Sequence, residues 1–403
     1  MTAPLDGIRV VELANFVAAP SGGALMADLG AEVIKIEPPG GDPWRARMAT
    51  TNPMWFIFNH DNRGKRSVML DITRPDGAEA ARRLIDRADV FLTNLLPHRR
   101  TRLGFDPETL HARNPRLIYV GVTGYGPAGP DANRPGFDYS AFWAASGIMG
   151  KLVPEDQPPP LSRPALGDHI TGLTNLTATL AALRLRDLTG AGQTVELSLF
   201  SVGAWVNGQD ILTAAYTGTE PSLHDRARPA NPLWNTYRCA DGRWLMLTML
   251  QPDLYWERFC VALGHDEWLT VEEWQSTPGR AADSARLTAA IDAVFITDTR
   301  ASWGDRLDEY GVIWAPVATT RETATREQIA AQQLIRWLDV AGTRMPVVAS
   351  PFAIRGAETG PRGRAPWPGE HTEEVLRELG YTTDEIAVLR AQAEARTAET
   401  PNF

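Results

Sequence analysis

The feature that most constrains this chain is the alternation of short apolar runs with helical segments over its first 200 residues. The candidates in this part are strands at 7–14, 31–37, 66–72, 89–95 and 116–126 and helices at 21–29 and 76–87. Strands that alternate with such helices predict βαβ units and a largely parallel sheet. Ligands of such sheets bind at the carboxyl ends of the strands, where the strand order reverses.

The rest of the chain continues the pattern and then departs from it. The predicted parts are a helix at 170–186, a strand running into a helix at 192–205, a linker at 205–235, a smaller α/β unit at 236–320, and a β-like segment and a helix at 372–379 after residue 330. Four leucines between residues 173 and 183 share one face of the helix at 170–186, which predicts that this face packs on the core. Asp241-Gly242 predicts the turn of a hairpin that opens the smaller unit.

Composition and charge exclude several kinds of partner. The 403 residues carry a net charge of −9, and the single basic cluster at 99–102 is too short for a nucleic-acid surface but could bind a small anion. No secretory signal is visible, and the apolar stretch at 170–185 is too short to cross a bilayer. Two cysteines and seven scattered histidines show no disulfide or metal-binding spacing. A cytoplasmic protein without metal, membrane or nucleic acid is expected.

Asp168, in "PALGDHITG" (164–172), is the sharpest candidate for chemistry. An aspartate just before a helix commonly caps it, because its carboxylate accepts hydrogen bonds from free N–H groups. The helix dipole would hold such a carboxylate ionised, which suits a nucleophile equally well. Gly167 allows a close approach to a ligand, and a long glycine- and proline-rich loop at 124–139 follows a predicted strand, as binding loops often do. Both roles of Asp168 stay open on this pattern.

Two common phosphate-binding patterns are missing from the sequence. The segment after the first strand, "ANFVAAPSGG", lacks the G-x-G-x-x-G fingerprint, and no Walker A motif occurs. Ser21-Gly22-Gly23 could cradle a phosphate, but close packing of a helix explains these small residues as well. A dinucleotide oxidoreductase is therefore not expected.

Seven sequence blocks, in order, resemble family III CoA-transferases of the CaiB/BaiF type. They are the opening "PLDGIRVVELANFVAAPSGG", then "NRGKRSVMLDI", "DVFLTNLLPHRRTRLG", "GYGPAGP" with "RPGFDY", "ALGDHITG", "GQTVELSLF" and "APWPGEHTEEVLRELG". The resemblance implies an α/β fold with a Rossmann-like large domain whose first part is 1–204, a smaller α/β domain at 236–320, and a segment at 321–403 that contains the return linker and the C-terminal part of the large domain. It also implies a homodimer of two interlocked rings.

The resemblance assigns Asp168 as the nucleophile and coenzyme A as the substrate carrier. An aspartate carboxylate can take the acyl group from a donor thioester as an anhydride and then carry CoA as an aspartyl thioester. The positions that the resemblance associates with CoA and the acyl site are Leu70, Asp71, Asn94, Leu95, Arg102, Gly124, Phe137 and Tyr139. Arg102 fits on chemistry too, since guanidinium groups bind phosphate. Arg63, Lys65 and Arg66 are expected to add positive charge, and backbone N–H groups near Gly124 or Gly167 to stabilise an oxyanion.

Departures from related branches narrow the activity. Related α-methylacyl-CoA racemases carry His where this chain has Phe137, and phenylalanine cannot serve as one of the two bases that racemisation needs. The formyl-CoA branch carries Gln where Val17 stands, so an apolar acyl pocket formed with Phe16 and Trp143 is expected. Transfer of CoA from an acyl-CoA to a free carboxylic acid is the main hypothesis. A racemase or epimerase with an altered base pair and a catalytically idle CoA-binding paralogue are the alternatives.

Overall fold

The computed structural model describes residues 2–45, 55–154, 156–340 and 342–399. The chain forms two compact units. The first consists of residues 1–221 and 330–403, so that both ends of the sequence contribute to it, and the second of residues 222–329. None of the described helices is long and apolar enough to cross a membrane.

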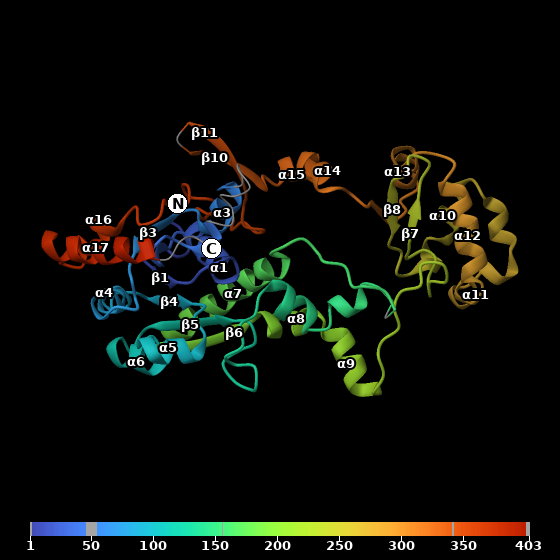
Figure 1. Ribbon diagram of the computed structural model, residues 1–403. Coiled ribbons are helices and arrows are strands. Elements are labelled where there is room, and N and C mark those ends of the chain that lie inside the picture. The colour runs from blue at the N-terminus through green and yellow to red at the C-terminus, as the bar shows by residue number, and fades with distance from the viewer. Residues whose placement is uncertain (1, 46–54, 155, 341, 400–403) are drawn as a thin grey trace. The chain divides into compact units, whose positions relative to one another are not determined.

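A six-stranded parallel sheet forms the centre of the first unit (Figure 1). Its strands are β1 (Arg9–Leu13), β2 (Glu32–Glu37), β3 (Lys65–Met69), β4 (Val90–Thr93), β5 (Ile118–Thr123) and β6 (Gln193–Ser198). The order is β3-β2-β1-β4-β5-β6, and Val10 pairs with both Val33 and Val90. The prediction of a parallel sheet is confirmed, and the strand order reverses between β1 and β4.

Helices cover both faces of this sheet, which is why its strands are apolar on both sides. One face, with Val10 and Val120, packs with α1 (Ala18–Asp28), α7 (Leu166–Thr189) and α8 (Leu199–Val206). The other face, with Val11 and Tyr119, packs with α4 (Pro75–Ile85), α6 (Pro107–Arg113), α16 (Thr372–Glu378) and α17 (Thr383–Glu399). Figure 1 shows α16 beside β3, although about 300 residues separate them in sequence.

The structure contains helices that the sequence pattern did not predict. Among them are α3 (Trp55–Asn62), α5 (Pro97–Leu103), α6, α9 (Gly208–Thr217) and α17. Helix α9 lies inside the segment predicted as a linker, and within the first unit. On α7, Leu176 and Leu183 are buried as expected, but Leu180 is 37% exposed. The buried face of α7 instead includes Thr179 and Gly172, because small residues there allow α1 to approach closely.

Two antiparallel sheets complete the fold. Strands β10 (Ile335–Val340) and β11 (Thr343–Val348) form a hairpin in the first unit. The second unit has a sheet of β7 (Thr236–Arg238), β8 (Trp244–Leu247) and β9 (Trp314–Pro316) with α10 (Trp256–Leu263), α11 (Thr277–Ala282), α12 (Ser284–Phe295) and α13 (Arg300–Glu309). The predicted hairpin at Asp241-Gly242 is confirmed, since β7 and β8 pair antiparallel across it and Gly242 has φ 74°.

Candidate active site

A cavity of about 200 Å³ opens at the carboxyl ends of β1, β4 and β5, where the strand order reverses. Its lining residues are Asn15, Phe16, Ala18, Asn94, Leu96, Arg99, Val122, Thr123, Gly124, Pro135, Gly136, Phe137, Asp168 and Leu199. The loops after three strands and the first turn of α7 therefore meet at one place. This is the position at which a parallel sheet is expected to bind its ligand.

The loop after β1 is held in a strained conformation at this cavity. Phe16 has φ 66°, in the left-handed region that residues other than glycine rarely adopt. The side chain of Asn94 holds the backbone of Asn15, the residue before Phe16. Its Oδ1 accepts from Asn15 N at 3.2 Å and its Nδ2 donates to Asn15 O at 2.8 Å. Asp42 Oδ1 accepts from Phe16 N at 3.2 Å. Strain persists only where such contacts enforce it, and it is concentrated at functional sites.

Buried ion pairs made by Lys35 of β2 also stabilise this loop. Lys35 Nζ contacts Glu12 at 3.0 Å and Asp42 at 2.9 Å and donates to Ala14 O at 2.6 Å. Burial opposes ionisation of Glu12, but Lys65 and Lys35 outweigh it and hold the Glu12 pKa below its usual value. Buried ion pairs and hydrogen bonds thus stabilise the loop that carries Phe16.

The three basic residues expected to add charge for CoA are used inside the protein instead. Arg63 Nη2 lies 2.6 Å from Asp28, Lys65 Nζ lies 2.8 Å from Glu12, and Arg66 pairs with acidic groups of β2 and α16. Arg63 and Lys65 are buried. That expectation is wrong, because a run of basic residues in a sequence does not show which of them have internal partners.

Asp168 does not cap α7. The helix begins at Leu166 after Ala165, which has φ 72°, so that Asp168 lies within the first turn. Asp138 takes the capping role: its Oδ2 accepts from Ala165 N at 2.9 Å, and the N–H groups of Gly167 and Asp168 help to lower its pKa, although burial still raises it overall. The Gly167 N–H therefore faces Asp138, which argues against the oxyanion role considered for it.

Gly167 serves packing rather than contact with a ligand. A Cβ at this position would lie 2.2 Å from Phe142 Cγ and 2.4 Å from Asp138 Oδ1. Both residues belong to a π-helix at Asp138–Ala144, a helix type that is rare and often found at functional sites. Only glycine lets the start of α7 approach this helix, and the approach sets the position of Asp168.

The Asp168 carboxylate is not held ionised, contrary to the expectation from the helix dipole. Burial, followed by the negative charge of Asp138, raises its pKa to about 7, and His169 opposes this shift. Among the described residues it has no hydrogen bond or ion pair of its own. Close to neutral pH the group is divided between its two protonation states. Such a perturbed carboxylate in a cavity is a candidate for catalysis.

Two histidines that are far apart in the sequence meet beside Asp168. His169 Nε2 lies 2.9 Å from Asp61 Oδ1, and the rings of His60 and His169 are 5.3 Å apart. Donor atoms of the three residues lie within 4.8 Å of one another, so a metal ion could be considered. However, Arg63 faces His60 Nδ1 at 3.4 Å, and Asp61 already accepts from His169. This arrangement favours an ion pair over a metal site.

The residues that the resemblance associates with CoA fall into two groups. Asn94, Gly124 and Phe137 line the cavity together with Asp168. Gly124 and Gly136 touch so closely that a Cβ on Gly124 would lie 2.7 Å from Gly136 Cα, which folds the loop at 124–139 back over the cavity.

The other candidates do not line this cavity. Leu70 is 1% exposed in the core, and Asp71 Oδ1 accepts from Thr73 N at 3.0 Å in a turn. Leu95 packs against the core, Tyr139 OH donates to Ser162 O at 2.6 Å, and Arg102 is exposed on α5. In this structure, Asp71, Leu95 and Tyr139 have local structural contacts.

Sequence reasoning missed the basic residue that does reach the cavity. Arg99 lines it, whereas Arg100 is buried and pairs with Glu196 at 2.6 Å. Successive residues of a helix point in different directions, so a basic cluster at 99–102 cannot all face one ligand. The basic cluster at 99–102 was the only sequence feature that indicated Arg99, and the geometry of α5 decides which of its residues faces the cavity.

Only part of the expected apolar pocket is present at the cavity. Phe16 and Phe137 line it and form an edge-to-face pair with ring centroids 5.4 Å apart. Val17 is buried away from it, and Trp143 packs on Phe142 with centroids 5.6 Å apart. The two phenylalanines therefore share the apolar lining of the cavity with Leu96, Val122 and Leu199.

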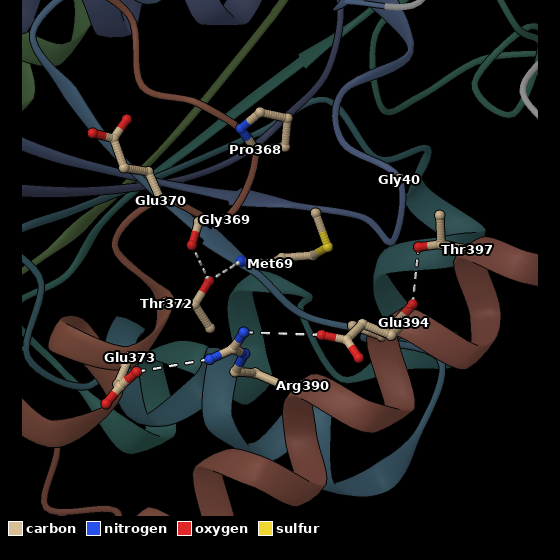
Figure 2. Close-up of a pocket in the computed structure, with 11 residues that line it drawn as sticks. Gly40, Met69, Pro368, Gly369, Glu370, Thr372, Glu373, Arg390, Glu394 and Thr397 are labelled. Carbon is tan, nitrogen blue, oxygen red and sulfur yellow. Dashed lines mark hydrogen bonds and ion pairs between the residues drawn. The ribbon is translucent and has the colours of Figure 1, made fainter.

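A second cavity of about 630 Å³ lies at the end of β3, between that strand, α16 and α17 (Figure 2). Figure 2 shows Arg390 between Glu373 and Glu394, at 3.7 and 3.9 Å. With Glu370, the lining has three carboxylates against one guanidinium. This charge balance disfavours a ligand rich in phosphate.

Comparison with known proteins shows which family this chain resembles in sequence and structure. Residues 5–372 match the family described as CoA-transferase family III. The chain is 31% identical to an (R)-2-hydroxy-4-methylpentanoate CoA-transferase of Clostridioides difficile, over 95% of this chain and 97% of the relative. It is 32% identical to a cinnamoyl-CoA:phenyllactate CoA-transferase of Clostridium sporogenes, over 96% of each chain. A solved CaiB/BaiF family protein from Brucella suis superposes with a TM-score of 0.82 at 30% identity, covering 94% and 100% of the two chains.

Proposed function

We propose that Asp168 carries the acyl group and then CoA during the transfer, because the chain belongs to CoA-transferase family III and is a CoA-transferase. The observation that carries the proposal is the Asp168 carboxylate itself. It lines the cavity at the reversal of strand order, has no partner among the described residues, and has its pKa raised to about 7. A carboxylate without partners is free to attack a carbonyl.

The proposed steps balance without any further reactant. Asp168 attacks the donor thioester carbonyl, the C–S bond breaks, and CoA thiolate leaves a mixed anhydride on the enzyme. The thiolate attacks the aspartyl carbonyl of that anhydride, which releases the donor acid and leaves an aspartyl-CoA thioester. The acceptor carboxylate attacks this thioester, the C–S bond breaks, and a second anhydride and free CoA thiolate result. The thiolate then attacks the acceptor carbonyl of that anhydride and breaks its bond to the Asp168 carboxylate oxygen. Acceptor acyl-CoA leaves, and the Asp168 carboxylate is restored.

CoA would be held by the residues around this group. Asn94, Gly124 and Phe137 line the same cavity, and Arg99 supplies a cation for a phosphate or carboxylate. Arg102 remains a proposed phosphate contact through the resemblance. Phe16 and Phe137 favour an apolar acyl group. The two relatives named above act, by their names, on acids with branched alkyl or aromatic groups, which supports the same choice for this chain.

We also propose that two copies form the interlocked dimer implied by the resemblance. Both ends of the sequence meet in one unit, so the chain leaves that unit at residue 221 and returns to it at 330. In such a dimer, residues 236–320 would form the small domain and 205–235 the linker to it, and 321–403 would form the return linker and the C-terminal part of the large domain. Exposed apolar side chains on α8 and α9 support an additional partner surface.

The test is intact mass spectrometry after mixing the protein with isocaproyl-, cinnamoyl-, succinyl- and 2-methylacyl-CoA. An adduct on the peptide that contains Asp168, trapped by hydroxylamine or borohydride and lost in Asp168→Asn, is expected with the apolar donors. Absence of any adduct, with deuterium entering the α-carbon of the 2-methylacyl-CoA, would instead indicate racemase chemistry. CoA binding without either reaction would indicate an idle paralogue.

A further inference from the structure

The residue that follows Asp168 on α7 forms a histidine–aspartate pair that takes no part in the proposed reaction steps. His169 follows Asp168 on α7, and its Nε2 is 2.9 Å from Asp61 Oδ1 on α3. The Asp61 side chain is 1% exposed. A buried carboxylate is costly without a cation beside it, so this contact favours the protonated form of His169.

The charges that surround the pair are mostly negative. Burial lowers the pKa of His169, but its hydrogen bond to Asp61 and the charges of Asp61, Asp168 and Asp138 raise it above the usual value. His60, from α3, stays neutral because burial lowers its pKa to about 4. The nearby guanidinium of Arg63 is paired with Asp28.

Among the described residues, Lys65 also attracts Asp61, but its Nζ is paired with Glu12 at 2.8 Å, whereas His169 is the cation that contacts the Asp61 carboxylate directly. Asp138 caps the start of α7, and Asp61 approaches from α3. Both repel a negative charge on Asp168, whereas His169 attracts it. Without His169, the two other carboxylates would disfavour the form of Asp168 that can attack.

We propose that His169, held by Asp61, is a positioning residue that increases the ionised fraction of Asp168, the form that attacks the donor thioester. Neighbouring residues of a helix point in different directions, so His169 acts through its charge and not as a base on the substrate. Asp61 holds the ring by its hydrogen bond and keeps it charged. This inference rests on the proposed role of Asp168.

Carboxyl ¹³C NMR of aspartate-labelled protein gives the titration midpoint of Asp168, assigned with Asp168→Asn. Loss of one adjacent positive charge in His169→Gln should raise that midpoint by about one pH unit. His169→Lys, which keeps the charge, should leave it near the wild-type value, and so should His111→Gln on α6. In Asp61→Asn/His169→Gln, loss of the repelling carboxylate should bring the midpoint back toward wild type.

An unmoved midpoint in His169→Gln would overturn the inference, and so would an equal displacement in His169→Lys. Should His169→Gln fail to fold, imidazole ¹⁵N NMR of the wild type still decides, because a His169 midpoint at or below that of free histidine contradicts the charged pair. The acid limb of acyl-enzyme formation should move with the NMR midpoint, while the Kd for CoA stays constant. If the wild type forms no acyl-enzyme at all, the proposed function fails, and the NMR titrations still report on the pair.

Discussion

At the scale of single residues, the Asp168 carboxylate lowers the free energy of unfolding, and it is also the proposed nucleophile. Its pKa rises from 3.8 to about 7 on folding, so the folded state keeps a proton that the unfolded state releases between these values. The free energy of unfolding must therefore fall as pH increases through this window. Enzymes commonly accept such a cost at their reactive groups.

Asp168→Asn should consequently stabilise the protein at pH 8, by roughly 1–2 kcal/mol, because the amide carries no charge to desolvate. The gain should shrink below pH 7 and vanish near pH 4, where the carboxyl is neutral in both states. Urea unfolding at pH 4, 6 and 8 measures the difference. A gain that does not change with pH would contradict the shifted pKa of Asp168.

Arg99 supports a second prediction at this scale. Arg99→Gln should raise the KM for acyl-CoA about tenfold, the effect of losing one charge-assisted hydrogen bond. Arg116→Gln is a matched control, since it removes the same charge from a side chain that donates to Gly190 O and does not line the cavity. Initial rates at two salt concentrations give the comparison. Equal KM values for the two variants would exclude Arg99 from the binding site.

At the scale of elements, the contact between α1 and α7 fixes the start of α7. Ser21, Gly22 and Gly23 lie inside α1 and are buried, so they do not form a phosphate cradle. A Cβ on Gly22 would lie 2.3 Å from Asn175 Nδ2, and one on Gly172 would lie 2.1 Å from Ser21 Oγ. The small residues let two helices pack at short distance, which is the alternative that the sequence left open.

Gly172→Ala should therefore destabilise the protein by about 1–3 kcal/mol through overpacking. Ser21→Ala in the same chain should recover part of this loss, because it removes the oxygen that the new methyl group meets. Gly208→Ala on α9 is the control: nothing lies within 4 Å of its Cβ position, so stability should stay equal or rise. Urea unfolding of wild type, Gly172→Ala, Ser21→Ala, the double variant and Gly208→Ala checks this, and additive losses in the double variant would contradict the contact.

At the scale of the whole molecule, the first unit leaves a large apolar surface uncovered. Trp205 at the end of α8 is 86% exposed, and Leu212 and Tyr216 on α9 are 70% and 94% exposed. Aromatic side chains that stand out from a surface in this way commonly contact a partner. Periodicity could not reveal this surface, because α9 has no buried residue among those described.

Trp205→Glu/Tyr216→Glu should weaken a dimer of this chain at least about 100-fold, as loss of interface aromatic residues does. Leu188→Glu is the control, because Leu188 is 65% exposed and lies at the other end of α7 from the cavity. Light scattering across a dilution series gives the mass of each protein. A monomeric wild type would contradict the proposed dimer, and an unchanged dimer in the aromatic variant would place its interface elsewhere.

The sequence by itself determined the parallel sheet and the family. Hydrophobic periodicity and seven ordered blocks are local properties, and they needed no knowledge of contacts. The sequence also singled out Asp168, since the glycine and helix around it are visible in nine residues. Its capping role and its charge were predicted wrongly, because both depend on Asp138 and on burial, which come from another part of the chain.

Only the tertiary structure decided which side chains share a site. Arg63 and Lys65 found buried partners, while Arg99 reached the cavity, although all three are equally basic in the sequence. Asp61 and His169 meet across 108 positions of the chain. A charge, a hydrogen bond or a clash depends on distances of a few ångströms between residues that are remote in sequence, and those distances exist only after the helices have packed on the sheet.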